Sequence, residues 1–443
     1  MITTVHIVMI VLSVALIMGI GATSAHNKKG FATAKGQAGP WIVAGAIIGT
    51  LVGGQATIGT AEMGYQFGFS GIWFTLGSAL GCLLLYAATP QLRATGCNTL
   101  LEIVGRRFGK KAEITGSLLS LFGMFFSIVA QQLACAALIR AIVPCTLLTA
   151  LVAGTLVMLA YVVMGGMMGA GKGGVAKLVL LYAACLVSGS VVLYNTHGLS
   201  DFDISQFNPF NRGLSTDLNS ALSMILGVVA TQSYAQAIWA GRTSAIARRG
   251  ALLSAVLIPP IGIACTLVGM YMHACGATVI ASTAFPAFAL SYLPHWLGGV
   301  VMGTLLVTVI GGCTGIALGS SVIVVRDLLQ RPLEQSSTLV RITLVVIMSM
   351  ALLASLLMTG TLINDLGFMS LGLRAGSILI PLGCAFFMRR RVNGRYIVAS
   401  MIISVATMLI MNMAGANWLS PTLCGLAAGL LPIVVDQCTH KVK

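Results

Sequence analysis

Charged side chains are scarce in this chain. Asp, Glu, Lys and Arg make up 8% of its 443 residues, whereas soluble domains carry about a quarter. Hydrophobic residues reach 57%, so a separate water-soluble domain is excluded. Acidic residues are the scarcest, 10 against 25 basic ones, which gives a net charge of +15 at pH 7. These cations are divided among short loops rather than gathered in one stripe, so no nucleic-acid partner is expected.

Several signatures of catalysis and metal binding are also missing. The sequence has no CxxC pair and no HExxH, and all six histidines fall at the ends of apolar runs or between them. A nucleotide-binding loop is excluded because Lys172 is followed by Gly173 rather than Ser or Thr. The eleven cysteines fall mostly inside apolar runs, where they act as small core residues. We therefore predict neither an enzyme nor a bound cofactor.

What the sequence does contain is a series of long apolar runs. A bilayer core of about 30 Å requires about 20 apolar residues in each crossing helix. The runs predict an all-α polytopic membrane protein, a single integral-membrane domain over residues 1–443 in contact with the lipid bilayer. The thirteen predicted spans are residues 3–24, 41–64, 70–90, 114–142, 146–165, 176–195, 219–239, 250–274, 296–324, 340–360, 368–387, 396–414 and 418–437.

The distribution of cations predicts the orientation. Among 25 Lys and Arg residues, only Arg140, Arg212 and Arg374 fall outside the segments that the spans place on one side. Cationic loops stay cytoplasmic, so we expect a cell (inner) membrane protein with its N-terminus outside and its C-terminus in the cytoplasm. The first span could be a signal peptide, but Lys28 and Lys29 follow it and no cation precedes it, which indicates a retained helix.

Two of the predicted helices are interrupted by polar residues. In span two, Gly53 and Gly54 precede the polar run 55–62, and in span seven residues 231–236 carry several hydrogen-bonding side chains. Glu62 is the only carboxylate well inside a span, and burying an acid there costs about 2.5 to 3.5 kcal/mol. It therefore either has a functional role or snorkels near the outer end of its helix.

Amide and hydroxyl side chains at these depths predict a site for a small polar solute. In lipid each polar group needs a partner, so these side chains face a ligand, water or a neighbouring helix. The two adjacent glutamines of span four could equally join two helices, and Arg374 is expected to pack or snorkel. The predicted solute residues are Gln55, Thr57, Glu62, Gln131, Gln132, Gln232, Tyr234 and Gln236.

The two interrupted helices lie five spans apart. Transporters are often built from two repeats, each beginning with a discontinuous helix, and an odd number of spans inverts the second copy. We predict a leading helix at 3–24, repeat one at 41–195, repeat two at 219–387 and two trailing helices at 396–437.

Short motifs in this order resemble a known family. They are residues 59–65 with Gly68, residues 99–109, residues 231–236 with 247–250, and Arg326-Asp327 at the end of span nine. Together they resemble the sodium/solute symporter family, whose fold is the LeuT-like five-plus-five inverted repeat. The resemblance covers about residues 3 to 437 and implies uptake of a small solute by alternating access, with Na⁺ as the coupling ion.

The resemblance also implies where sodium would bind. Its position is the junction of spans two and nine, with carbonyl ligands most nearly at Gly49, Val52 and Thr308. Two hydroxyl ligands of the family fall on Gly311 and Gly312, which have no side-chain oxygen.

That departure leaves three alternatives open. A buried acid such as Glu62 could carry a proton, the carrier could be uncoupled, or the chain could be a transporter-like sensor with the same pocket. A membrane-embedded enzyme is disfavoured because no nucleophile with a nearby base appears at depth.

Overall fold

The computed structural model describes residues 2–25, 36, 38–97, 99–332, 336–388, 392–415 and 419–439, without the side chains of 17–25 and 162–176. Several cations behind the predicted orientation lie outside these described residues, namely Lys28, Lys29, Lys35, Arg389, Arg390, Arg391, Lys441 and Lys443, and so does the side chain of Lys172. The described part is almost entirely helical, with one isolated β-bridge between Ala38 and Gly241.

Helices follow one another through the chain. The first half contains α1 (Thr4–Ala25), α2 (Pro40–Leu51), η1 (Gln55–Gly59), α3 (Thr60–Phe67), η2 (Gly68–Ile72), α4 (Trp73–Ala94), α5 (Leu100–Phe108), α6 (Lys110–Ile142) and α7 (Leu147–Asn195). The second half contains η3 (Ile204–Phe207), α8 (Leu214–Val229), α9 (Gln232–Ala240), α10 (Ser244–Ala274), η4 (Ala281–Thr283), α11 (Ala284–Ser291), α12 (His295–Val322), η5 (Ile323–Leu328), α13 (Ser337–Leu357), α14 (Ile363–Phe387), α15 (Gly394–Met413) and α16 (Pro421–Thr439).

The predicted spans correspond to apolar helices. Among the described residues, nine helical segments are long and apolar enough to cross a membrane, or ten if the bent pair α8 and α9 is one span. Three shorter apolar helices, Thr4–Leu16, Pro40–Leu51 and Leu147–Tyr161, cover the remaining predicted spans. One detail of the prediction is wrong, because the spans at 146–165 and 176–195 both lie in the continuous helix α7. Its sequence has many glycines but no proline, so the helical hydrogen bonds are not interrupted.

The first predicted interruption is confirmed. Helix α2 ends at Leu51, and Val52 has a non-helical backbone with φ −86° and ψ 84°. The chain resumes as the π-helix η1 and continues as α3. Two consecutive glycines at 53 and 54 permit this break because no side chain stands in the way of neighbouring helices.

The second predicted interruption is confirmed at its first residue. Helices α8 and α9 meet at an angle of 43°. Thr231 has an extended backbone, with φ −98° and ψ 121°, and Gln232 begins α9. Both interrupted helices therefore break beside residues with polar side chains or with none, as the sequence indicated.

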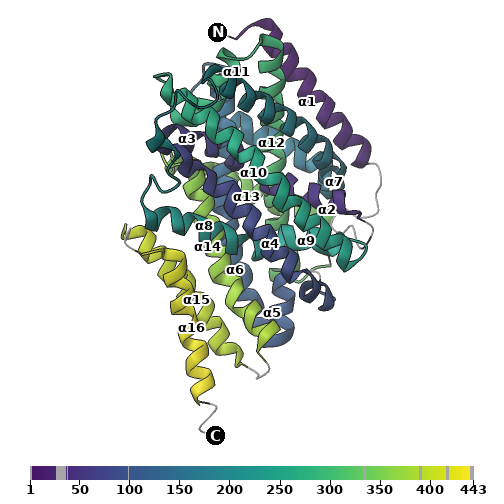
Figure 1. Cartoon of the computed structure of the whole chain (residues 1–443). Coiled ribbons are helices and arrows are strands. Elements are labelled where there is room, and N and C mark those ends of the chain that lie inside the picture. Colours follow the sequence, from purple (N-terminus) through teal and green to yellow (C-terminus); the bar gives the residue numbers. More distant parts are fainter. Residues whose placement is uncertain are drawn as a thin grey trace.

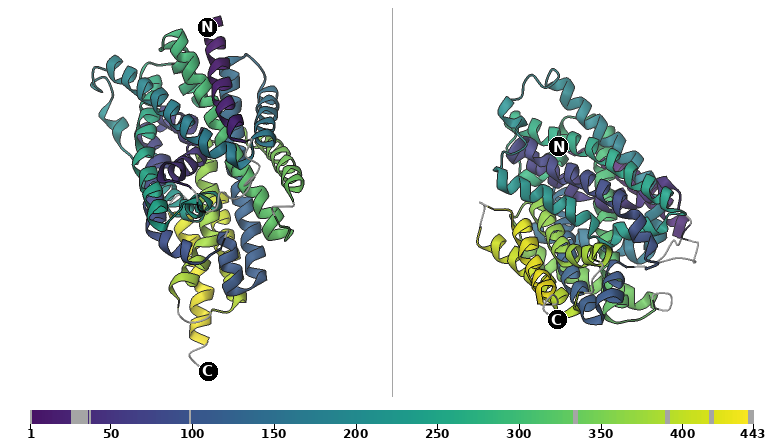
Figure 2. Two further views of the ribbon diagram at one scale, coloured as in Figure 1. Left: turned by 90° about the vertical axis from the view of Figure 1, so that its right-hand side faces the viewer. Right: turned by 60° about the horizontal axis from the view of Figure 1, so that its bottom comes forward.

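The helices pack into one bundle, with the two termini at opposite ends of the molecule (Figure 1). Helix α2 packs against α7, α10 and α12, and helix α14 packs against α6 and α8. Helices α15 and α16 form a pair against α14 and extend toward the C-terminal end, as both views in Figure 2 show.

The order of elements occurs twice along the chain. A broken helix, a long helix, a short helix and another long helix appear as α2–α3, α4, α5 and α6, and again as α8–α9, α10, α11 and α12. This order agrees with an internal repeat, whose boundaries stay a prediction.

Candidate functional site

Gln131 of α6 fills the break in the first interrupted helix. Its Oε1 accepts a hydrogen bond from the Gly54 N–H at 2.7 Å. A Cβ placed on Gly53 would lie 2.3 Å from Gln131 Nε2, so the glutamine approaches a backbone that only glycine leaves open. Gln131 Nε2 is itself buried with no hydrogen-bond partner among the described residues. The Gln131 oxygen thus binds the backbone at the break, while the two hydrogens of its Nε2 have no described acceptor.

The neighbouring Gln132 has a different environment. Its Nε2 donates to the Met348 carbonyl at 3.0 Å, and its Oε1 accepts from the Ser355 hydroxyl at 3.0 Å. Both partners belong to α13, so Gln132 joins two helices. Of the two adjacent predicted solute residues, only Gln131 lies beside the broken helix.

Further unpaired amide atoms surround η1. Gln55 Nε2 is buried without a described partner and lies beside Gly367 of α14, where an added Cβ would be 2.7 Å away. Asn364 Oδ1 is also unpaired and faces Gly59, at 2.3 Å from an added Cβ. Thr57, by contrast, donates its hydroxyl hydrogen to the Gly53 carbonyl at 3.0 Å. Buried amide atoms without partners are rare, and here they flank the same short helix.

Glu62 contacts the beginning of another helix. Its side chain is buried, and Oε2 accepts from the backbone N–H of Ile363 at 2.9 Å, where α14 starts. The first N–H groups of a helix lack partners within the helix and favour a negative charge. The carboxylate therefore caps α14, an arrangement that the sequence did not indicate because the two residues are 301 positions apart.

A buried arginine lies at the second break. Arg374 is 1% exposed, and its Nη1 donates to the Thr231 hydroxyl at 2.9 Å. Nη2 donates to the hydroxyls of Ser127 at 2.9 Å and Ser370 at 2.7 Å, and Nε donates to the Ser370 carbonyl at 3.1 Å. Thr231 in turn donates to the Gly227 carbonyl at 2.7 Å. Of the two roles expected for Arg374, packing within the bundle is confirmed and snorkelling is wrong, because hydroxyls from α6 and α14 solvate it there.

The remaining predicted solute residues of α9 lie in separate environments. Gln232 Oε1 accepts from the Leu100 N–H at 2.9 Å, which ties α9 to the start of α5. Tyr234 is buried, whereas Gln236 is half-buried. The structure thus brings Gln55 and Gln131 to the first break and leaves Gln232 at a helix junction. Their role in solute binding stays a prediction.

Lys177 lies at the junction of α2, α7 and α12. Its side chain is 5% exposed, and Nζ donates to the Gly49 carbonyl at 2.8 Å and the Thr308 carbonyl at 3.0 Å. A Cβ placed on Gly311 would lie 3.1 Å from this Nζ. This position was not predicted, because the order of the spans places Lys177 with the cations at the cytoplasmic edge. The run of apolar residues after Lys177 gave no signal that its ammonium turns into the bundle.

Ion pairs connect elements at the two ends of the bundle. Arg326 of η5 pairs with Glu102 of α5 at 2.6 Å, and Arg106 reaches the other oxygen of Glu102 at 2.7 Å. Arg212 before α8 pairs with Asp365 of α14 at 2.7 Å. The Arg326–Glu102 and Arg212–Asp365 pairs are partly buried but still reach water, so each contributes on the order of 1 kcal/mol and can break when helices move.

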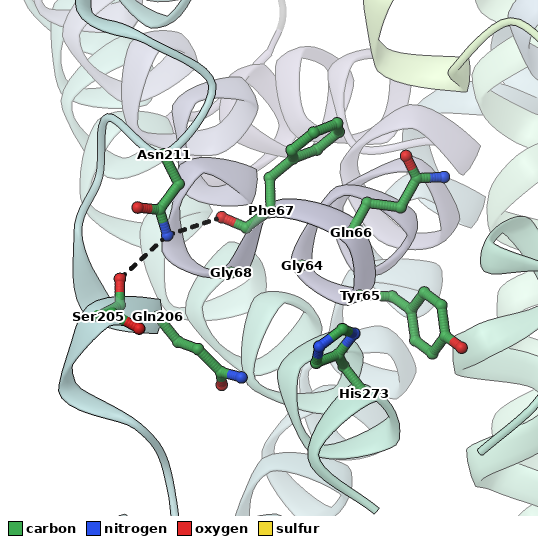
Figure 3. A pocket seen from close by; sticks show the side chains of 9 residues that line it. All are labelled: Gly64, Tyr65, Gln66, Phe67, Gly68, Ser205, Gln206, Asn211 and His273. Atoms are coloured by element: carbon green, nitrogen blue, oxygen red, sulfur yellow. Dashed lines mark hydrogen bonds between the residues drawn. The ribbon is translucent and has the colours of Figure 1, made fainter. Parts of the chain in front are cut away.

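A polar cavity of about 300 Å³ lies at the end of α3. Figure 3 shows Ser205 and Asn211 on one side of it and Tyr65 and His273 on the other. Asn211 Nδ2 donates to the carbonyls of Phe67 at 3.2 Å and Ser205 at 3.1 Å, which holds the segment after α7 against α3. Beside the cavity, hydrogen bonds from the backbone and side chain of Ser205 lower the pKa of the Asp203 carboxyl.

Comparisons with known proteins agree with this architecture. Residues 31–404 match the family described as "Sodium:solute symporter family". The "Uncharacterized symporter YwcA" of Bacillus subtilis (strain 168) is 29% identical over 157 residues. This match covers 35% of this chain and spans only 30% of that relative's length.

Two solved structures share the fold. The first is the substrate-bound outward-open state of a Na⁺-coupled sialic acid symporter, with a TM-score of 0.81 and 15% identity over 100% of this chain and 98% of that one. The second is Mhp1, a nucleobase-cation-symport-1 family transporter in a closed conformation with bromovinylhydantoin bound. Its TM-score is 0.61, with 15% identity over 92% of this chain and 93% of the other.

Proposed function

Because this chain belongs to the sodium:solute symporter family, we propose that it is a secondary transporter that carries a small polar organic solute by alternating access. The apolar helices make it a multi-pass membrane protein. The positive-inside rule supports an inner-membrane location with the N-terminus outside. In the family, a cation moving down its gradient drives the solute.

The first helix break supports the proposed position of the solute. Transporters of this architecture bind solute where a helix is discontinuous, since its opened backbone offers polar groups at the centre of the membrane. Here Gln55, Gln131 and Asn364 keep unpaired amide atoms around η1. This is the observation that carries the proposal, because each unpaired buried group costs about 1–3 kcal/mol that a polar ligand could recover.

The ion pairs at the two ends of the bundle support alternating access. The Arg326–Glu102 pair lies at the end of the bundle where α5 is drawn in Figure 1, and the Arg212–Asp365 pair ties the α8 segment to the start of α14. Opening one end at a time requires breaking contacts at that end, and these pairs are weak enough to be broken. The cavity at the end of α3 provides a polar entrance on the side of Arg212.

The test starts with the purified protein and a panel of amino acids, sugars, sugar acids and nucleobases. A solute that binds the folded state raises its melting temperature, and that solute is then used for uptake into proteoliposomes. Gln55→Leu should weaken binding at least about tenfold because it removes an unpaired amide at the break. Gln132→Leu is the matched control, since Gln132 bonds only α13 among its described contacts, and it should keep the wild-type affinity.

Two results would contradict the proposal. One is that a solute binds but is not taken up or exchanged by proteoliposomes, which would indicate a sensor. The other is that Gln132→Leu weakens binding as much as Gln55→Leu, which would place the solute away from the first break.

A further inference from the structure

The carbonyls that resemble the family's sodium ligands surround a lysine in this chain. Gly49 and Thr308 were predicted as two of the carbonyl ligands, and both accept hydrogen bonds from Lys177 Nζ, at 2.8 Å and 3.0 Å. Lys177 lies more than 125 residues from either, on a different helix, as the separations of 128 and 131 positions show. The structure thus brings two of the three predicted ligands together, but around an ammonium group.

The broken helix makes the Gly49 carbonyl available. In an uninterrupted helix this oxygen would accept from the N–H of Gly53, but that N–H donates to the Leu51 carbonyl at 3.1 Å. The last carbonyls of a helix carry a partial negative charge and attract a cation. A lysine ammonium satisfies them as a compact unit charge, as a metal ion would.

The two glycines of α12 fit an ammonium better than a sodium ion. A side chain at position 311 would begin 3.1 Å from Lys177 Nζ, so glycine leaves room for the lysine. At position 312 an added Cβ would lie 2.8 Å from the Cα of Gly53, so a hydroxyl side chain is excluded there by the backbone. The absence of the two hydroxyls and the presence of the buried lysine therefore agree with each other, because both suit an ammonium group at this position rather than a sodium ion.

The residues present do not fit sodium at this position. A sodium ion bound to the Gly49 and Thr308 carbonyls would lie within contact distance of an equal charge, and two buried cations repel strongly. The position also lacks both hydroxyl oxygens, whereas a hard cation needs several oxygen ligands. No ion pair joins Lys177 to a carboxylate within the part of the chain that the structure describes.

We propose that the amino group of Lys177 takes the place of the sodium ion at the junction of α2, α7 and α12. The lysine holds the broken end of α2 against α12, as a bound ion would, and sodium does not bind at this position in the wild-type protein. The inference deepens the proposed function by defining its cation position, but its test needs no solute and does not depend on transport.

The test compares melting temperatures of purified protein in sodium chloride and in choline chloride, at equal ionic strength and one pH. The wild type should show no sodium-specific rise. The variant Lys177→Ala with Gly311→Ser removes the ammonium and adds one hydroxyl, so it should show a sodium-specific rise of about 3 °C or more. Lys111→Ala, which removes an exposed lysine, is the control and should behave like the wild type.

A second measurement covers the case in which the double variant does not fold. Lys177→Ala alone should be stabilised by methylammonium chloride over choline chloride, because the small ammonium can enter the vacated position, whereas the wild type should not respond. An equal sodium-specific rise in wild type and double variant would overturn the proposal, because sodium would then bind with the lysine present. Absence of both the sodium response and the methylammonium response would also overturn it, because the carbonyls would then not form a cation position.

Discussion

Each of the two interrupted helices of this protein is stabilised by a buried cationic side chain, but the two side chains make different contacts. At the first break, Lys177 donates to the backbone carbonyl of Gly49, and Gln131 accepts from the backbone N–H of Gly54. At the second break, Arg374 reaches the backbone of the broken helix through a side chain, because it donates to the Thr231 hydroxyl, which donates to the Gly227 carbonyl. In both places a buried cation compensates for carbonyls that an interrupted helix leaves without partners.

The difference between the breaks lies in what remains unsatisfied. Four hydrogen bonds satisfy most of the Arg374 guanidinium, and they connect three helical segments. Around the first break, Gln55 Nε2 and Gln131 Nε2 have no described partner. Arg374 therefore ties the second break to α6 and α14, whereas the first break keeps amide donors for a ligand.

Replacing the second cation should have the largest effect. Arg374→Leu leaves the hydroxyls of Thr231 and Ser127 without the donor that Arg374 provides, and should lower the free energy of unfolding by about 3 kcal/mol or more. Denaturant unfolding in detergent micelles measures this change. Arg140→Leu, in which a half-buried arginine beside an open cavity is replaced, should stay within about 0.5 kcal/mol of wild type. If both variants unfold alike, the second break is not held by Arg374.

At the first break, removal of the amide should have an intermediate effect. Gln131→Leu leaves the buried Gly54 N–H without an acceptor, which should cost about 1–3 kcal/mol of folding free energy. Hydrogen exchange followed by mass spectrometry should show faster exchange of peptides that cover residues 52–60. Faster exchange confined to α13 would instead indicate that the effect acts through its neighbour Gln132.

The smallest effect is expected at the far end of the first broken helix. Glu62→Gln keeps an acceptor for the Ile363 N–H but removes a charge from a helix N-terminus, which should cost about 1 kcal/mol or less. The pH profile of solute uptake should keep its shape in this variant, because the carboxylate acts as a cap. A flattened profile would show that Glu62 carries a proton during transport.

The sequence and the structure agree on where the helices break. Consecutive glycines followed by the polar run 55–62 mark the first position, and the hydrogen-bonding run 231–236 marks the second. They agree less well on side-chain roles. Gln131 and Gln132 are neighbours of the same type, yet one faces the break and the other faces α13, because successive residues point about 100° apart around a helix.

Composition and hydropathy determined that this chain is a membrane-embedded helical protein, since the cost of burying charge and unpaired backbone in lipid leaves few alternatives. The positions of the breaks followed from consecutive glycines and from runs of polar side chains, which stand out in an otherwise apolar helix. Only the tertiary structure decided that Lys177 reaches Gly49 and Thr308, and that Glu62 reaches Ile363. Those contacts join residues more than a hundred positions apart, and no local pattern specifies which distant backbone group a long side chain will meet once the helices have packed.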